Sequence, residues 1–299
     1  MGEAKTEIAK GDDQTEDITI LGEKLYILQD TNKIQEGRFG FLPKYLDIYF
    51  NLLLNKEKEI KQHYLTKTKT GYFFKYGSKQ NEFQFLNAIG SIFGLSIDDI
   101  KKRMIHILSN DTNEQIFTSL NNGDVKTQFK SVNAFIDYIK MSNYLDYDIT
   151  QSLLSIPKVI TSYGINIIVF NKKIHIIKKL LEKEVSKEDF YLNCQDYENI
   201  INITDAKRET IFLLKENKNY YPIIMVKKED EENKSMELTK TFNYKNEKNN
   251  IVNYILDYFK KNCFGSFLDD ILYKNKSLTA KEMYFKLDAL ERDFQPKYQ

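Results

Sequence analysis

The sequence is poor in the residues that build covalent cross-links and transition-metal sites. Its 299 residues include two cysteines, Cys194 and Cys263, and three histidines, His63, His106 and His175. A disulfide framework needs more cysteines than this, and a Cys-x-x-Cys zinc site needs a closer spacing. Both arrangements are excluded, and a histidine-rich metal centre is not expected.

Long apolar runs and a strong excess of charge are also missing. No run approaches the roughly 18 apolar residues of a membrane span, since the stretch from Asn166 to Phe170, which is apolar from Ile167, is followed by polar Asn171 and Lys172. Residues 1–17 are acidic and lack the basic and apolar regions of a signal peptide. The formal net charge is +1, so any affinity for nucleic acid must come from a local basic patch.

The sequence does have enough apolar residues for a core, and two kinds of periodicity. Apolar residues make up 41% of the chain and aromatic residues 13%, which excludes global disorder. We expect an acidic disordered tail over residues 1–17, a mostly helical part over 18–157, a β-rich part over 158–247 and C-terminal helices over 248–299. The predicted fold class is α+β, with a mainly antiparallel β-sheet between the helical N-terminal part and the closing helices.

Local patterns predict individual elements within these parts. Alternation predicts strands at residues 18–21, 25–28, 165–170, 174–177, 210–214, 220–226 and 238–244. The turn-forming residues 216–219 predict a hairpin between two of these strands. Helical spacing follows Pro43 and recurs over residues 83–93, 132–139 and 251–259. Ser96 with Asp99, and Thr279 with Glu282, are typical of capping boxes at helix starts.

Residues 71–79 superficially resemble a phosphate-binding loop. Five residues separate Gly71 from Gly77 instead of four, and four bulky aromatics lie between them. A phosphate cradle needs backbone amides that are free to converge. We therefore favour a buried strand with a polar end for this segment.

A second arrangement, Asp205, Glu216 and Lys218, has the order and spacing of a metal-dependent nuclease site. That chemistry needs carboxylates on a divalent ion and a lysine near the attacking water. Glu216 and Lys218 fall in the predicted hairpin turn, and residues 205–208 are typical of an exposed turn. The two cysteines carry no hydrolase signature. We expect a non-enzymatic protein without cofactor or metal, and keep the nuclease as a second alternative.

The strongest candidate for binding is a basic–aromatic segment over residues 56–79. It contains seven lysines against Glu57 and Glu59, with five interleaved aromatics. Lysines neutralise phosphates and release counterions, and exposed aromatics stack on bases. The alternative is a solvated lysine loop that leads into a buried aromatic strand. The predicted DNA contacts are Lys67, Lys69, Lys75 and Lys79, with Tyr72 or Tyr76 as a stacking group.

Several segments, taken in order, resemble a region of the early transcription factor large-subunit-like proteins of nucleocytoplasmic large DNA viruses, the giant-virus and poxvirus assemblage. These segments are residues 37–43, 74–77, 83–89, 120–123 with Phe129, 163–170, 210–224 and 240–242, and an amphipathic helix that ends at Cys263. Only four of the 44 basic residues are arginine, and tryptophan is absent. This composition is typical of an AT-rich genome and agrees with such a source.

The resemblance implies a function for the chain. In that family the large subunit recognises early promoters beside an ATPase small subunit and helps to recruit the viral RNA polymerase. We therefore expect a module of a viral transcription-initiation factor, found in the virion and in the host cytoplasm at the viral factory. Its expected partners are double-stranded promoter DNA and the viral RNA polymerase or ATPase small subunit, with no membrane. The first alternative is a protein-interaction or scaffold domain of a virion or transcription complex.

Overall fold

The computed structural model describes residues 17–20, 23–28, 33–52, 71–180, 183–192, 202–228, 236–245 and 250–261. Three sets of predictions lie outside these residues. They are the tail up to residue 16, the DNA contacts Lys67 and Lys69, and the C-terminal segment from residue 262 with its helix start at Thr279.

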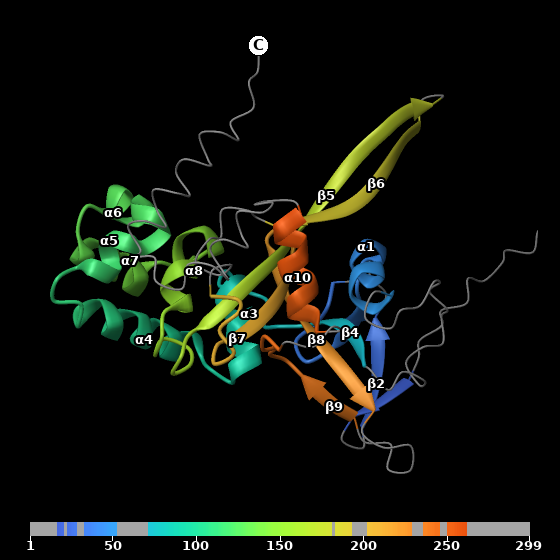
Figure 1. The fold of residues 1–299 in the computed structure, drawn as a ribbon, viewed down its shortest axis with the longest axis horizontal. Helices are drawn as coiled ribbons and strands as arrows, with labels where there is room; N and C mark the ends of the chain where they lie inside the picture. The colour runs from blue at the N-terminus through green and yellow to red at the C-terminus, as the bar shows by residue number, and fades with distance from the viewer. Residues whose placement is uncertain are drawn as a thin grey trace, which may run out of the picture.

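A nine-stranded mixed sheet forms the centre of the fold (Figure 1). Its strands are β1 (Asp17–Ile20), β2 (Glu23–Leu28), β3 (Phe39–Phe41), β4 (Tyr72–Tyr76), β5 (Ile165–Leu180), β6 (Lys183–Leu192), β7 (Glu209–Glu216), β8 (Asn219–Lys228) and β9 (Met236–Thr239). The order across the sheet is β1-β2-β3-β4-β8-β7-β5-β6, and β9 pairs with β8. Two of the described pairs, β2–β3 and β5–β7, are parallel, and the other six are antiparallel.

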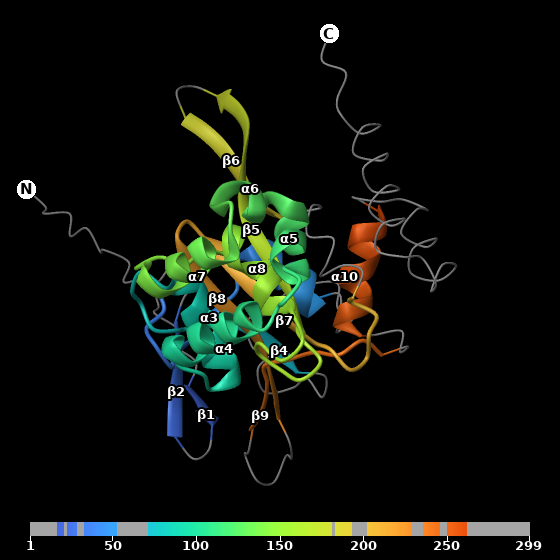
Figure 2. The same ribbon diagram turned by 90° about the vertical axis from the view of Figure 1, so that its left-hand side faces the viewer.

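Helices from two parts of the chain pack on the sheet. One set consists of α3 (Gln84–Phe93), α4 (Ile97–Ser109), α5 (Gln115–Ser119), the 3₁₀ turn η3 (Leu120–Gly123), α6 (Asp124–Phe129), α7 (Val132–Met141) and α8 (Tyr147–Ser155). The other consists of α1 (Lys44–Asp47), the π-helical turn η1 (Ile48–Leu52) and α10 (Ile251–Phe259). The views in Figures 1 and 2 show the two sets on opposite sides of the sheet. The predicted α+β class is confirmed.

Strand alternation explains why the sheet is covered on both faces. In β5 and β7 the residues Ile167, Val169, Ile211 and Leu213 are buried against α3–α8. The alternate residues of these strands, such as Phe212, are buried against α1, η1 and α10. Both faces therefore read as apolar, and each strand appears in the sequence as a nearly continuous hydrophobic run.

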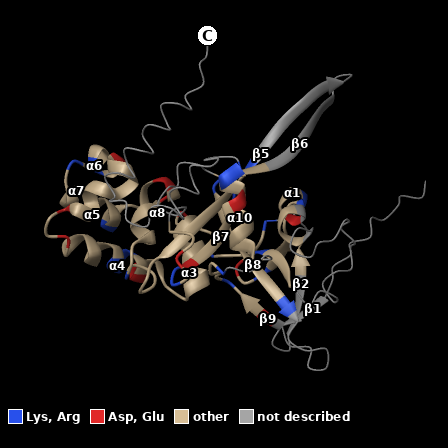
Figure 3. Cartoon of the chain, viewed as in Figure 1, with Lys and Arg blue, Asp and Glu red and all other residues tan. Residues whose placement is uncertain are grey.

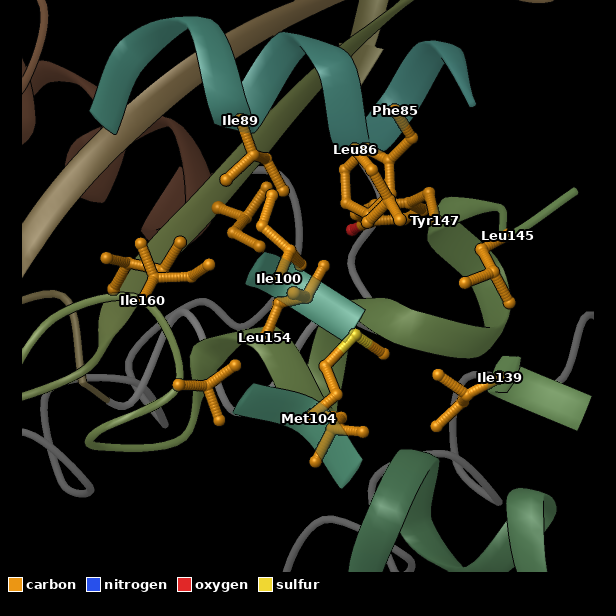
Figure 4. Close-up of a cluster of buried hydrophobic side chains, with 14 of the residues drawn as sticks. Phe85, Leu86, Ile89, Ile100, Met104, Ile139, Leu145, Tyr147, Leu154 and Ile160 are labelled. Carbon is orange, nitrogen blue, oxygen red and sulfur yellow. The ribbon is translucent and has the colours of Figure 1, made fainter. Parts of the chain in front are cut away.

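The core under α3–α8 is built by helices that cross one another. Figure 4 shows Phe85, Leu86 and Ile89 of α3 converging on Ile100 and Met104 of α4. The predicted capping box starts α4, because the Asp99 amide donates to Ser96 Oγ at 3.1 Å and Ser96 Oγ donates to Asp99 Oδ2 at 2.6 Å. A local signal thus fixes where α4 begins, and the core fixes which face it buries. Among the described helices, none is long and apolar enough to cross a membrane.

The strands of the predicted helical part and the predicted β-rich part share one sheet. Residues 174–177 belong to the same strand as 165–170, because β5 runs on to Leu180. The strand predicted over 238–244 ends at Thr239, after which Phe242 makes a single bridge to Thr210. The sequence patterns did not predict β3 at Phe39–Phe41 or β6 at Lys183–Leu192. β4 is the buried aromatic strand favoured for residues 71–79.

Candidate nucleic-acid interface

The basic–aromatic segment enters β4, and the strand's alternation separates its residues onto two faces. Phe73 and Lys75 lie on the face covered by α10, whereas Tyr72, Phe74 and Tyr76 lie on the other face. Consecutive residues of a strand point to opposite sides. Within β4, which belongs to the described part of this segment, the aromatic residues and Lys75 are therefore divided between the two faces of the sheet.

Lys75 is a buried structural cation, which corrects its prediction as a DNA contact. Its side chain is 1% exposed, and its Nζ lies 3.3 Å from Glu216 Oε2. The same Nζ lies 5.3 Å from the centre of the Tyr221 ring. Burial raises the pKa of Tyr221, and the nearby Glu216 carboxylate raises it further. Glu216 and Tyr221 thus give the buried lysine the polar partners that a charge needs in the interior.

The two predicted stacking residues are half-buried and already packed against protein groups. Tyr72 donates its hydroxyl hydrogen to Asp47 Oδ1 at 2.7 Å, and its ring centre lies 5.0 Å from that of Phe74. The Tyr76 ring lies 5.3 Å from Phe39, and Lys240 Nζ lies 5.4 Å from its centre. Burial raises the pKa of Tyr76. A base that stacked on either ring would have to displace these contacts.

Lys79 is the predicted contact that the structure leaves exposed, and it lies at one end of the sheet. The preceding Ser78 donates a 3.4 Å hydrogen bond to the carbonyl of Tyr220, which places this turn beside the start of β8. On the other side of β4, the Gly77 amide donates to the carbonyl of Arg38 at 2.9 Å. Lys79 therefore lies between the turn before β3 and the β7–β8 hairpin.

Three further basic residues lie at this same end of the sheet. Arg38 precedes β3, Lys218 lies in the β7–β8 turn, and Lys215 pairs with Tyr220 just before that turn. Arg38 and Lys218 are exposed, and Lys215 is half-buried with its Nζ 5.1 Å from the Tyr220 ring centre. We call Arg38, Lys79, Lys215 and Lys218 the basic end. From β3 to β7 there are three strand spacings, or about 14 Å, close to the roughly 12 Å width of a DNA major groove.

The basic end carries more positive than negative charge. The Lys75–Glu216 pair is neutral as a unit. Three further carboxylates act on its tyrosines, against four basic residues: Glu36 acts on Tyr76, and Asp146 and Asp148 act on Tyr220. Over helices α4–α7, by contrast, Figure 3 shows acidic and basic residues intermixed.

Asp146 anchors the helical layer beside the basic end. It accepts hydrogen bonds from the Tyr144 hydroxyl at 2.7 Å, the Tyr220 hydroxyl at 2.8 Å and the Tyr147 amide at 2.8 Å. Burial alone would raise the pKa of Asp146, but these hydrogen bonds and the charge of Lys215 outweigh it and lower the pKa. Burial and Asp146 together raise the pKa of Tyr144 to about 12. This cluster ties α8 to β8 and fixes the position of Lys215.

The three residues of the nuclease alternative are not brought together. Asp205 lies in an exposed turn before β7, and Glu216 is the last residue of that eight-residue strand. A strand rises about 3.3 Å per residue, so the two carboxylates are separated by more than roughly 20 Å. Glu216 is paired with Lys75, and Lys218 is exposed in the turn. Within the described residues, no three His, Cys, Asp or Glu side chains form a group that could hold a metal ion.

Arg208 differs from the predicted exposed turn at residues 205–208. Asp205 and its two followers are exposed, but Arg208 is 6% exposed and its guanidinium lies under the start of β5. It donates to Asn166 Oδ1 at 3.0 Å and to the carbonyls of Ser155 at 2.7 Å and Ile165 at 2.8 Å. This arginine joins α8 to the parallel β5–β7 pair, so it has a structural role.

The sequence patterns place Lys218 only in the nuclease alternative, and they predict no site role for Arg38 or Lys215. Neither lies in a lysine-rich run, and they are 177 positions apart in the sequence. They lie at the same end of the sheet because β3, β4, β8 and β7 follow one another in the strand order. The signal that could have found them is their position at strand ends. Arg38 directly precedes a strand and Lys215 lies next to the last residue of one, where side chains reach solvent even when the middle of the strand is buried.

Comparison with known proteins identifies the kind of organism from which the chain comes. The chain is 50% identical over 291 residues to a protein of Acanthamoeba polyphaga mimivirus described as "Uncharacterized protein R327". The aligned region covers 96% of this chain and 18% of that protein. The chain is thus a giant-virus protein, as the composition and the resemblance led us to expect.

The same comparisons set the limit of what similarity says about function. The chain spans 18% of the length of the mimivirus protein that it matches. No model of a protein family matches the chain. No solved structure matches it either. The function therefore has to be argued from the geometry of the basic end and from the motif resemblance.

Proposed function

We propose that this chain is a non-enzymatic module of a giant-virus early transcription-initiation factor, and that it contacts promoter DNA through the basic end of its sheet. The observation that carries the DNA contact is the convergence of Arg38, Lys79, Lys215 and Lys218 from three separate turns and strands. The transcription role rests on the motif resemblance and the giant-virus source.

The physical argument for DNA is one of local charge on a nearly neutral protein. The whole chain carries a net charge of +1, so long-range attraction to DNA is weak. A short row of cations at the strand ends of a sheet can still neutralise several phosphates, and each neutralised phosphate releases counterions. The Lys75–Glu216 pair and the Asp146 cluster hold the strands that carry this row.

The test is fluorescence anisotropy with an AT-rich promoter-like duplex and a scrambled duplex, titrated with the whole chain at about 50 to 200 mM salt. The test variant is Lys79→Gln/Lys218→Gln. The matched control is Lys126→Gln/Lys140→Gln, which removes two exposed lysines from α6 and α7. We expect the test variant to reduce the slope of log affinity against log salt by about 1.8, or about 0.9 for each lost phosphate contact.

Each outcome of this titration bears on one part of the proposal. Equal slopes for the test and control variants would show that DNA does not contact the basic end. No binding of either duplex at 50 mM salt would overturn the DNA-contact proposal altogether. A preference of the wild-type chain for the promoter-like duplex would support the initiation role, and equal affinity for the scrambled duplex would count against it.

A protein-docking domain is the second candidate, and one exposed pair of residues favours it. Met141, the last residue of α7, is 80% exposed, and Tyr144, in the connection between α7 and α8, is 47% exposed. The Tyr144 hydroxyl is bonded to Asp146, which holds the ring in place. Large exposed side chains held this way suit a partner interface. Loss of binding to purified viral RNA polymerase on Met141→Glu/Tyr144→Glu, with unchanged DNA affinity, would support this function; unchanged polymerase binding would remove it.

A further inference from the structure

The turn between α8 and β5 carries an exposed aromatic ring that the proposed function does not use. This turn covers residues 156–164, and its Tyr163 is 56% exposed. Beside it lies the turn before β7, from which Lys207 places its Nζ 5.5 Å from the centre of the Tyr163 ring. A cation within about 6 Å of a ring centre is attracted to the ring. With Lys158, which is exposed in the first turn, we call Tyr163 and Lys207 the tyrosine site.

Two arginines hold the turn that presents the ring. Arg103 of α4 donates from Nη1 to the carbonyls of Ile160 at 3.1 Å and Val159 at 3.4 Å. Arg208 donates from Nη1 to the carbonyl of Tyr163 at 3.0 Å, in addition to its bonds to α8 and β5. The sequence has only four arginines among its 44 basic residues, and two of the four bind this turn.

Burial and backbone geometry fix the same turn from within. Val159 and Ile160 are buried in the core under α3–α8, and Figure 4 shows Ile160 among the side chains of that core. The Thr161 hydroxyl donates to the carbonyl of Gly164 at 2.9 Å. Gly164 has a φ of +84°, and a side chain there would come within 2.6 Å of Arg208 Nη1. The exposed ring is therefore carried by a fixed backbone, which lowers the entropy that binding a ligand costs.

The charge around the exposed ring is positive. Residues 156–164 contain one charged side chain, that of Lys158. The neighbouring turn over residues 202–208 adds Asp205, Lys207 and the buried Arg208. Asp205 Oδ1 accepts a 2.9 Å hydrogen bond from the Lys207 amide, so this carboxylate is engaged within its own turn. Two exposed lysines against one carboxylate favour an anionic ligand over a basic one.

A ligand that uses both the ring and the lysines must offer a flat face together with negative charge. The bases of a nucleic acid stack on tyrosine, and its phosphates bind lysine. Bases inside a duplex are covered by their neighbours, so a ring that projects from a turn meets a base face only where the strand is unpaired. An acidic peptide would engage the lysines but has no flat group for the ring.

We propose that the tyrosine site binds single-stranded nucleic acid, with one base stacked on Tyr163 and the adjoining phosphates at Lys158 and Lys207. The site is distinct from the basic end. β7 has eight residues and spans roughly 23 Å, and it separates the turn that carries Lys207 from the β7–β8 turn. The inference therefore does not depend on the proposed duplex contact.

Fluorescence anisotropy of the whole chain with unpaired oligonucleotides of about 10 nucleotides, one of thymidines and one of uridines, tests the base contact. The variants are Tyr163→Ala, the conservative Tyr163→Phe, and the matched control Tyr191→Ala, which removes a tyrosine that is 45% exposed on β6. Losing one stacked base should weaken binding by Tyr163→Ala about 5- to 100-fold. The other two variants should stay within about twofold of wild type. Circular dichroism and thermal melting check that each variant is folded.

The phosphate contacts are tested by Lys158→Gln/Lys207→Gln. Each phosphate contact to a single strand contributes about 0.7 to the slope of log affinity against log salt, so this variant should lower the slope by about 1.4. The control variant Lys126→Gln/Lys140→Gln, which removes the same charge from α6 and α7, should leave the slope unchanged.

The absence of tryptophan from the sequence allows a direct readout of stacking. Tyr163→Trp introduces the one indole of the chain, and a base that stacks on an indole quenches its fluorescence. The emission of Tyr163→Trp should fall when an oligonucleotide is added. The emission of the matched variant Tyr191→Trp should stay constant.

Three results would overturn the inference. Equal affinities of Tyr163→Ala and Tyr191→Ala, or a constant emission of Tyr163→Trp, would show that no base stacks on this ring. A loss of affinity in the lysine variant alone would reduce the site to a charged surface. Loss of binding to purified viral RNA polymerase on Tyr163→Ala, with unchanged oligonucleotide affinity, would assign the ring to a protein partner.

The outcomes also separate this inference from the proposed function. No binding of either oligonucleotide by the wild-type chain at about 50 mM salt would overturn the tyrosine site, whatever the duplex titration shows. Failure of duplex binding, with single-strand binding that depends on Tyr163, would overturn the duplex contact and support this site. Tighter binding of the uridine oligonucleotide would support the site as one for RNA, and tighter binding of the thymidine oligonucleotide would support it as one for an unpaired DNA strand.

Discussion

Removing either partner of the Lys75–Glu216 pair should destabilise the fold and leave DNA binding unchanged. The pair joins β4 to the end of β7 across β8, with a 3.3 Å distance between Lys75 Nζ and Glu216 Oε2. The informative set of variants is Lys75→Met, Glu216→Gln and the double variant. Methionine keeps most of the length of lysine, and glutamine keeps the shape of glutamate, so each change removes chiefly a charge.

The magnitude follows from the depth of each partner. At 3.3 Å and an effective dielectric constant near 20, the attraction is about 5 kcal/mol before desolvation is subtracted. Lys75 is 1% exposed and cannot regain water when the carboxylate is removed, so Glu216→Gln should cost about 3 kcal/mol. Glu216 is 20% exposed and regains part of its hydration, so Lys75→Met should cost about 1 to 2 kcal/mol.

The double variant makes the test decisive. With both charges gone, no buried ion is left without a partner, and the double variant should be more stable than Glu216→Gln alone. The expected coupling is about 2 kcal/mol. Urea unfolding followed by circular dichroism measures all four free energies. A stability of Lys75→Met within about 0.5 kcal/mol of wild type, together with a salt slope for DNA reduced by about 0.9, would refute the buried-pair reasoning and restore Lys75 as a DNA contact.

Three further predictions concern the stability of the fold. Because the pKa of Asp146 is lowered in the folded state, its contribution to stability is present above the unfolded value of about 3.9 and is lost as pH falls through the folded pKa. The difference in urea stability between wild type and Asp146→Asn should therefore be full at pH 7 and shrink below about pH 4. A difference that stays constant with pH would contradict the assignment. Gly164→Ala should cost at least about 1 to 3 kcal/mol, because φ is +84° and the new Cβ would lie 2.4 Å from the Ser155 carbonyl oxygen; an unchanged melting temperature would show that this turn relaxes freely. Phe212→Ala should cost about 3 to 5 kcal/mol, because its fully buried ring packs against the rings of Phe50, Phe170 and Phe242; a loss below about 1 kcal/mol in urea unfolding would mean that the cavity collapses.

Elements with a local signal could be predicted from the sequence. The β7–β8 hairpin follows from turn residues between two apolar runs, and the structure pairs Glu216 with Asn219 around Asn217 at φ +57°. The start of α4 follows from Ser96 and Asp99. α10 follows from apolar residues at helical spacing, and all of these face the sheet. Each of these signals acts over four to nine residues.

Elements that depend on distant partners could not be predicted. β3 has three residues and owes its strand conformation to pairing with both β2 and β4. β6 is rich in charged residues and has no apolar alternation over most of its length, so its strand conformation depends on β5. Arg208 looks exposed because it follows a polar turn, yet a cage of oxygen atoms from α8 and β5 buries it.

The basic–aromatic segment shows why a charged run is a weak guide to a binding surface in a β-protein. Lys75 and Lys79 are four positions apart, which on a helix would place them on one face. In this fold Lys75 lies within β4 and pairs with Glu216 in the interior, whereas Lys79 lies beyond the end of the strand at Tyr76 and is exposed. Whether a lysine of this segment is exposed therefore depends on whether it lies within the strand or beyond its end. The search for DNA contacts in such a fold therefore belongs at the turns that join the strand ends, where Arg38, Lys79 and Lys218 lie at the same end of the sheet.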